Sequence, residues 1–188
     1  MRKLKLQMQI SVDGFVARPD GQLDWMTWTW DDQLKSFTSE LTDTVDTILL
    51  GRKMTKEFVD HWEKAVKDDD KEEALFAKRM VDYEKYIFTK TLDKPYGLNS
   101  KLAKGDIVAE VNAIKAKSSD KDVIVYGGAN FVSSLIEKNL IDELYLFVNP
   151  RAISTGMKIF NQDTSLELIE STSFKCGVVV NKYKPKTS

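Results

Sequence analysis

Short strand-like runs and longer helix-like segments alternate along this chain. Residues 4–10 alternate apolar and polar positions, as in a strand with one buried face, whereas residues 47–50 are continuously apolar, as in a buried parallel strand. Leu34, Phe37 and Leu41 have the spacing of one face of an amphipathic helix. Further strands are predicted at residues 86–89, 107–109, 123–126 and 143–148.

The remaining segments complete an α/β order. Further helices are predicted after residue 51, around residues 75–80, at 111–117 and from residue 129 onward, whereas residues 93–104 are predicted to form a loop. Residues 166–174 and 178–183 flank a Lys-Cys-Gly turn, which predicts a closing antiparallel hairpin. We therefore expect an α/β fold with a mainly parallel sheet, to which the hairpin adds antiparallel strands at one edge.

Composition narrows the class of protein. The 188 residues fit a single domain over 1–188, and 28 basic against 29 acidic residues give a net charge of -1, which does not favour a nucleic-acid partner. No apolar run is long enough to span a bilayer, and residues 1–4 lead into a strand instead of a signal peptide. One Cys and one His cannot form an internal disulfide or a Cys/His zinc site. We expect a cytoplasmic protein with no membrane partner and no metal.

Two predicted strand-to-helix turns carry glycine. Gly51 precedes Arg52 and Lys53, and Gly127 is followed by Gly128. Amide N–H groups at a helix start bind anions, and glycine allows a phosphate to approach the backbone. The alternative is a tight turn that requires glycine for backbone reasons alone. Both turns belong at the carboxyl edge of the sheet, where open α/β folds bind ligands.

A third strand end adds a hydroxyl and a cation, Thr89 and Lys90. Together with Arg52 and Lys53 this places three cations near two glycine turns, which predicts a ligand with more than one phosphate. For Arg52 and Lys53 the alternative is a solvated pair, although the helix dipole disfavours cations at that position.

The loop over residues 13–32 is the other candidate site. Asp13 follows the first strand, where it either caps a turn or acts as a hydrogen-bond or proton-relay group. Trp25, Trp28 and Trp30 either stack on a planar substrate or pack in the core or at a dimer surface.

In chain order, these segments resemble the dihydrofolate reductase-like family, in the branch that contains the reductase domain of riboflavin biosynthesis. The resemblance covers nearly the whole chain, and it is carried by the order and spacing of short motifs. These motifs are residues 11–17, 46–53, 125–129 and 140–144, then Pro150, Gly156 and Phe160, and finally residues 177–180.

The resemblance implies a three-layer α/β/α fold that binds NADPH. Gly51, Arg52, Lys53 and Met54 would approach the adenosine and phosphate end, Thr89 and Lys90 the 2′-phosphate, and the turn after residue 125 the pyrophosphate. The implied cofactor residues are Gln9, Val16, Ala17, Gly51, Arg52, Lys53, Met54, Thr89, Lys90, Tyr126, Gly127, Gly128, Ala129, Asn130 and Phe131. Gln9, Val16 and Ala17 would flank the nicotinamide.

The substrate side implied by the resemblance contains Asp13, Trp25 and Asp32, with either Asp31 or Asp32 as the acid that holds a pterin. The reaction would be hydride transfer to a C=N or C=O carbon, with water or Asp13 delivering the proton. The substrate would be of the pterin or dihydrofolate type or of the ribosylaminopyrimidine type. The alternatives are a non-catalytic NADPH-binding protein on the same fold and a flavin-binding protein. The resemblance also implies a homodimer, with contacts through the late strands and the Pro150 loop.

Overall fold

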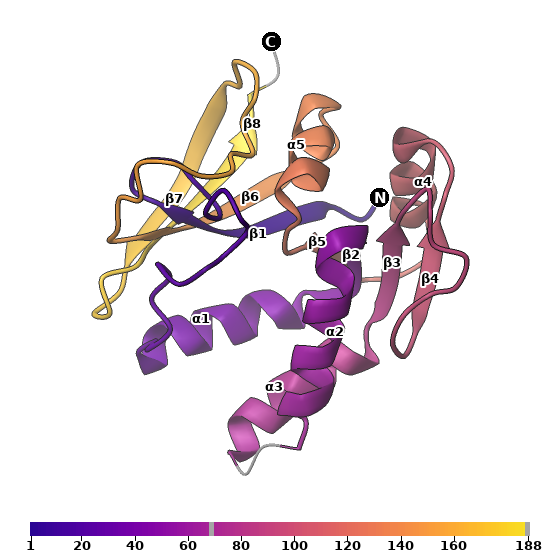
Figure 1. Cartoon of the computed structure of the whole chain (residues 1–188), viewed down its shortest axis with the longest axis horizontal. Coiled ribbons are helices and arrows are strands. Elements are labelled where there is room, and N and C mark those ends of the chain that lie inside the picture. Colours follow the sequence, from indigo (N-terminus) through magenta and orange to yellow (C-terminus); the bar gives the residue numbers. More distant parts are fainter. Residues whose placement is uncertain (68–69, 187–188) are drawn as a thin grey trace.

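The computed structural model describes residues 1–67 and 70–186, and over this part of the chain it contains one eight-stranded sheet (Figure 1). The strand order is β4-β3-β2-β5-β1-β6-β8-β7. The strands are β1 (Leu4–Ser11), β2 (Val45–Gly51), β3 (Glu84–Phe88), β4 (Ser100–Ala103), β5 (Asp122–Val125), β6 (Glu143–Asn149), β7 (Leu166–Ser173) and β8 (Val179–Pro185). All neighbours from β4 to β6 pair in parallel, whereas β8 and β7 are antiparallel at one edge. The predicted fold class is confirmed.

Helices cover both faces of the sheet. They are α1 (Asp32–Asp43), α2 (Arg52–Ala65), α3 (Lys71–Asp82), α4 (Ile107–Lys115) and α5 (Ala129–Glu137). Alternation along β6 separates the layers: Tyr145 packs with Leu34 of α1, whereas Leu144 belongs to the core that includes Leu135 of α5. Figure 1 shows α1, α2 and α3 on one side and α4 and α5 on the other. None of the described helices is long and apolar enough to span a membrane.

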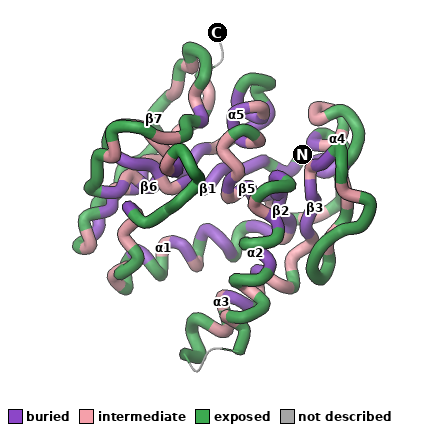
Figure 2. The backbone as a smooth tube through the Cα atoms, viewed as in Figure 1, coloured by how far each residue is buried: buried purple, intermediate pink, exposed green. Residues whose placement is uncertain are grey.

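The central strands are the most deeply buried part of the molecule. Leu4 and Leu6 of β1 and Ile48 and Leu49 of β2 have no exposed surface, because both faces of these strands lie under helices (Figure 2). This explains why residues 47–50 are continuously apolar. The edge strand β7 is largely exposed, as its colouring in Figure 2 shows. The glycine turns therefore extend from the most deeply buried strands of the sheet.

Two predictions of secondary structure were wrong. Residues 100–103, assigned to a loop, form the edge strand β4, which pairs in parallel with β3. The strand was missed because it is short and starts with the polar residues Ser100 and Lys101, so it lacks an apolar run.

Residues 107–109, predicted as a strand, form the first turn of α4. Asp106 caps this helix, since its carboxylate accepts hydrogen bonds from the N–H groups of Val108 and Ala109. Val111 and Ile114 then bury the inner face of the helix. An apolar triplet is compatible with either structure, and the cap decides it here.

Candidate active site

The two glycine turns lie in direct contact at the carboxyl edge of the sheet. Gly51 ends β2 and precedes α2, and Gly128 follows the neighbouring strand β5 and precedes α5. A Cβ atom on Gly128 would lie 3.7 Å from the Gly51 Cα atom, and one on Gly51 would lie 3.0 Å from the Phe131 Cβ atom. Gly128 also has a left-handed φ of 83°. The close contact with Phe131 therefore favours glycine at position 51, and the left-handed backbone favours glycine at position 128.

The helix starts at these turns differ from the other described helix starts. Asp31, Asp70 and Asp106 cap α1, α3 and α4, and each carboxylate accepts at least one backbone N–H. At α2 and α5 no side chain caps the helix, and the first turn contains no acidic residue. Their first amide groups and the positive ends of their dipoles are therefore available to an anion.

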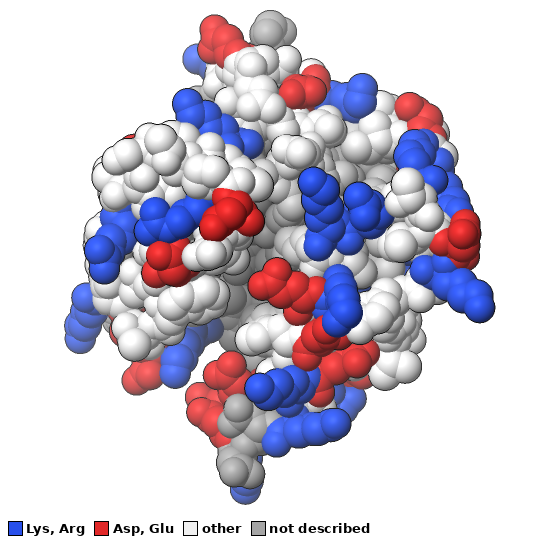
Figure 3. All heavy atoms as spheres, viewed as in Figure 1, with Lys and Arg blue, Asp and Glu red and all other residues white. Residues whose placement is uncertain are grey.

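Cations accompany one of these helix starts. Arg52 and Lys53 are exposed, and neither forms an ion pair with any residue that the structure describes. Figure 3 shows the surface hollowed between the loops at left and the helices α2 and α5, with Lys and Arg side chains on the right-hand rim. Two unpaired cations at a helix N-terminus are unfavourable until an anion binds between them and the backbone amides.

The third strand end is more constrained than the sequence indicated. The Thr89 hydroxyl oxygen accepts hydrogen bonds from the N–H groups of Thr91 and Leu92, both at 3.1 Å. The Lys90 ammonium donates to the carbonyl oxygens of residues 104 and 105, at 2.7 and 2.8 Å. Phe88, at the end of β3, packs against Phe131 of α5, with ring centroids 4.7 Å apart. The turn after β3 thus lies beside the Gly128 turn, but its Lys90 side chain is already bonded.

Among the other predicted cofactor residues, Val16 and Ala17 are buried and tied by backbone hydrogen bonds to Met157 in the loop after β6. The Met54 sulfur lies 3.1 Å from the position of a Cβ atom on Gly127. Ala129 and Asn130 form the first turn of α5.

The Tyr126 ring packs against the hydrophobic cluster between the sheet and α2. It stacks on Phe58 of α2 with a centroid distance of 5.7 Å, and burial raises the pKa of its hydroxyl well above the usual range. Only the backbone of Tyr126 is therefore part of the turn.

Asp13 holds a loop in place. Its carboxylate accepts hydrogen bonds from the Ser11 hydroxyl at 2.6 Å and from the N–H groups of Ile153 and Ser154 at 3.0 and 2.7 Å. The Ser11 hydrogen bond, followed by those from the two amides, keeps the pKa of Asp13 below its usual range. Of the two roles left open for Asp13, the geometry favours the cap. An ionised carboxylate with these partners is an acceptor, so it is poorly suited to deliver a proton.

Asp31 precedes α1 and Asp32 is its first residue, and the two carboxylates have different environments. Asp31 caps α1 by accepting from the Leu34 N–H at 2.9 Å, and its second oxygen accepts from the Cys176 N–H at 2.8 Å. These two bonds hold the pKa of Asp31 below its usual range. Asp32 is an exposed residue in the first turn of α1.

The three tryptophans have different environments. Trp25 is only 3% exposed, and its indole N–H has no partner among the described residues. Trp30 donates to the Thr27 carbonyl oxygen at 2.7 Å and stacks on Phe147 with a centroid distance of 6.1 Å. Trp28 is 66% exposed. Of the three, Trp25 combines burial with an unused hydrogen-bond donor.

Asn149, which sequence reasoning did not select, joins three parts of this region. It ends β6 and has no exposed surface. Its amide oxygen accepts from the Thr27 N–H at 2.8 Å, and its amide nitrogen donates to the Gln9 side-chain oxygen at 2.8 Å and to the Phe147 carbonyl at 3.0 Å. The one sequence signal was a polar residue that closes a buried strand before Pro150. Asn149 thereby fixes both the tryptophan loop and the side chain of Gln9.

Comparison with known proteins identifies the family. The RibD C-terminal domain family matches residues 2–180. The chain belongs to this family. It is 29% identical to the uncharacterized protein YyaP of Bacillus subtilis over 184 residues, which cover 95% of this chain and 92% of YyaP.

Two solved structures show the fold of this RibD-type chain. One is a diaminohydroxyphosphoribosylaminopyrimidine deaminase/5-amino-6-(5-phosphoribosylamino)uracil reductase from Thermotoga maritima, with a TM-score of 0.66 and 15% identity over 98% of this chain and 57% of that chain. The other is dihydrofolate reductase from Enterococcus faecalis complexed with NADP(H), with a TM-score of 0.62 and 14% identity over 98% and 97% of the two chains.

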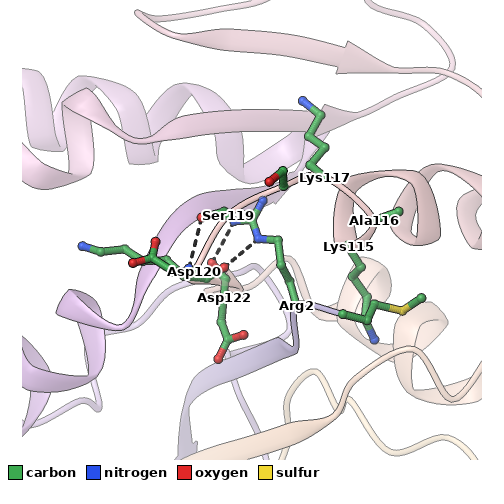
Figure 4. A pocket seen from close by; sticks show the side chains of 10 residues that line it. Arg2, Lys115, Ala116, Lys117, Ser119, Asp120 and Asp122 are labelled. Carbon is green, nitrogen blue, oxygen red and sulfur yellow. Dashed lines mark hydrogen bonds between the residues drawn. The ribbon is translucent and has the colours of Figure 1, made fainter.

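A second hollow of the RibD-type chain, of about 470 Å³, lies at the amino ends of the parallel strands (Figure 4). Arg2 at its wall bonds Asp46, Thr47 and two backbone carbonyls. Lys115 pairs with Asp142 at 2.5 Å. Arg2 and Lys115 already have anionic partners, in contrast to Arg52 and Lys53. We therefore interpret the ion pairs at the wall of this hollow as structural.

Proposed function

We propose that this chain is an NADPH-dependent reductase that transfers a hydride to a small planar heterocycle, of the pterin or dihydrofolate type or of the ribosylaminopyrimidine type. One observation carries the proposal. Two helix starts without side-chain caps meet at the carboxyl edge of the sheet, next to the unpaired cations Arg52 and Lys53. This combination suits a ligand with several phosphates and disfavours an empty site.

In this proposal each glycine turn binds a different part of the cofactor. The amides of Gly127, Gly128, Ala129 and Asn130 hold the pyrophosphate, with Tyr126 contributing backbone and Phe131 packing beneath. Gly51, Arg52, Lys53 and Met54 face the adenosine and phosphate end, and Thr89 and Lys90 lie beside the 2′-phosphate. Lys90 must exchange its carbonyl partners for the phosphate to make that contact.

Gln9, Val16 and Ala17 flank the nicotinamide, which supplies the hydride when the cofactor is bound. Trp25, Asp13 and Asp32 line the substrate side. Because Asp13 already accepts hydrogen bonds from Ser11 and from two amides, the proton comes from water in this proposal. The role of the protein is to orient the two rings and to exclude competing reactions.

The solved structures support the cofactor and the substrate class by analogy. The Enterococcus protein is complexed with NADP(H), and the Thermotoga protein is described as a reductase of an aminouracil. A shared fold does not fix a shared reaction, so the main support for the proposed reaction is the geometry of this chain.

A second candidate is a protein that binds NADPH without reducing a substrate. It is favoured by the carboxylates of the substrate side: Asp13 and Asp31 are engaged in structural hydrogen bonds, and Asp32 is exposed. The described site thus presents no buried carboxylate ready to hold a pterin, in contrast to what the resemblance implied.

Titration with NADPH and NADH, followed by tryptophan fluorescence and thermal shift, tests the cofactor. We expect NADPH to bind about tenfold more tightly than NADH or better, as one charge-assisted contact to the extra phosphate would give. No shift with NADPH at near-millimolar concentration would exclude both candidates. Loss of NADPH absorbance with dihydrofolate or the ribosylaminouracil then separates the reductase from the binding protein. The homodimer, the single domain over 1–188 and the cytoplasmic location stay predictions, and sedimentation tests the first of them.

A further inference from the structure

The orientation of one side-chain amide in the site is fixed by backbone chemistry. Asn149 is wholly buried, and two of its partners are backbone groups with one possible role each. The Thr27 N–H can only donate, so it requires the Asn149 oxygen, and the Phe147 carbonyl can only accept, so it requires the Asn149 nitrogen. The assignment of oxygen and nitrogen in Asn149 follows without ambiguity.

That assignment determines the orientation of Gln9. The remaining hydrogen of the Asn149 amide points at Gln9, 2.8 Å away, and requires an acceptor there. Gln9 must therefore present its oxygen to Asn149 and turn its NH₂ group away from it. The structure shows no hydrogen bond from this NH₂ group to any described residue. Gln9 is half-buried, so these donors are only partly accessible to water.

The surroundings of Gln9 are aromatic. In the sheet register Gln9 lies opposite Phe147, whose ring stacks on Trp30. The same Asn149 that holds Gln9 also holds the loop of Trp25 and Trp30 through Thr27. Trp25 is buried, and its indole N–H lacks a partner as well. A buried donor without an acceptor, such as the Trp25 N–H, is rare in folded proteins, whereas the Gln9 NH₂ group keeps access to solvent and so to a ligand.

We propose that Gln9, held in one orientation by Asn149, is the residue that selects the substrate, and that it does so by donating hydrogen bonds to a ring carbonyl. The proposal rests on the proposed function and adds to it the residue that recognises the ring: both proposed substrate types carry a ring carbonyl, and Gln9 is its donor. Asn149 is a positioning residue, since it acts through Gln9.

The test exchanges donors for acceptors on both sides of the contact. The probes are 5,6-diaminouracil and 2,4,5,6-tetraaminopyrimidine, which differ in having ring carbonyls or amino groups. Calorimetry on the NADPH-saturated protein should show a preference for the uracil of about tenfold. In Gln9→Glu the carboxylate still accepts from Asn149 but presents an acceptor to the site, so the preference should reverse. Gln9→Met should bind both probes weakly and about equally.

Two further variants separate orientation from charge and from folding. Gln33→Glu adds the same charge at an exposed position of α1 and should leave the preference unchanged. Asn149→Ala frees the Gln9 amide to rotate, so the preference should fall toward unity while the NADPH affinity stays unchanged. If this buried variant does not fold, the two Gln9 variants still decide the matter.

Each alternative result has a distinct meaning. Equal or undetectable binding of the two probes to the wild-type chain would overturn the inference. So would a Gln9→Glu variant that leaves the probe preference as it was, whatever it does to NADPH affinity, because Gln9 would then contact the nicotinamide alone. Absence of NADPH binding contradicts the proposed function instead, and the probe pair measured on the chain alone still reports on Gln9.

Discussion

Neutralising the two cations at the start of α2 should change stability and cofactor affinity in opposite directions. In the chain without ligand, Arg52 and Lys53 lie at the positive end of the helix dipole with no acidic residue in the first turn. The double variant Arg52→Gln and Lys53→Gln removes that repulsion with residues of similar helix propensity. If an anion binds there, the same change removes two charge-assisted contacts.

The magnitudes follow from the exposure of both side chains. A charge at a helix end is worth about 0.3–1 kcal/mol, and exposed charges such as these belong to the lower half of that range, so both together should raise stability by about 0.6–1 kcal/mol at low salt. For a chain of this size that corresponds to about 1–4 °C in Tm. The free energy of NADPH binding should weaken by about 1.4–2.8 kcal/mol, which is about 10- to 100-fold in Kd, since screening limits the contribution of exposed charges. Differential scanning fluorimetry measures the change in Tm, and a fluorescence titration measures the Kd for NADPH.

A matched control is available at the other end of the same helix. Lys64 lies in the last turn of α2, where a cation is favourable, so Lys64→Gln should lower Tm slightly and leave NADPH affinity unchanged. The reasoning would be refuted by a double variant that melts at a lower temperature than the wild type and still binds NADPH with the same Kd.

Three further predictions concern glycine, a cap and pH. Gly128→Ala places a side chain at φ 83° with only ordinary contacts nearby, so it should cost about 1–3 kcal/mol in urea unfolding and weaken NADPH binding, whereas Gly21→Ala, at φ 92° in open space, should cost a similar amount and leave NADPH binding intact. Asp106→Ala removes the cap of α4 and should cost about 1 kcal/mol, again with unchanged NADPH affinity. Because hydrogen bonds lower the folded-state pKa of Asp31, its contribution to stability is present above about pH 3.9 and is lost as the pH falls through the lower folded value. Asp31→Asn should therefore flatten the acid side of the urea-midpoint profile, and an unchanged slope would contradict this.

The sheet was predictable where burial on both faces leaves a signature in the sequence. Residues 48–50 and 123–126 are apolar because helices cover both sides of β2 and β5. The edge strand β4 carries no such signature, since its pairing with β3 depends on a register set elsewhere in the chain. In α4 the cap by Asp106 outweighs the β-propensity of Ile107 and Val108, which a pattern of apolar residues does not reveal.

The two glycine turns could also be located from the sequence, because glycine and cations mark a strand end without knowledge of distant residues, and their role in holding a cofactor stays a prediction. The hydrogen-bond network of the proposed substrate side could not be located in this way. Asn149 acquires its role from Thr27 and Gln9, which are 122 and 140 positions away in the chain. A polar residue at a strand end carries no information about such partners until the fold brings them together.

Three hydrogen-bonded contacts show that polar residues of the proposed substrate side have structural roles. Asp13 holds residues 153–154, Asn149 holds Thr27, and Asp31 holds Cys176. All three join the segment between β1 and α1 to later parts of the chain: the end of β6, the loop after it and the turn between β7 and β8. Side chains used in this way preorganise a site and are no longer available to a ligand. In the recognition that we propose, the donor left over is the Gln9 NH₂ group, and it selects an acceptor on the substrate.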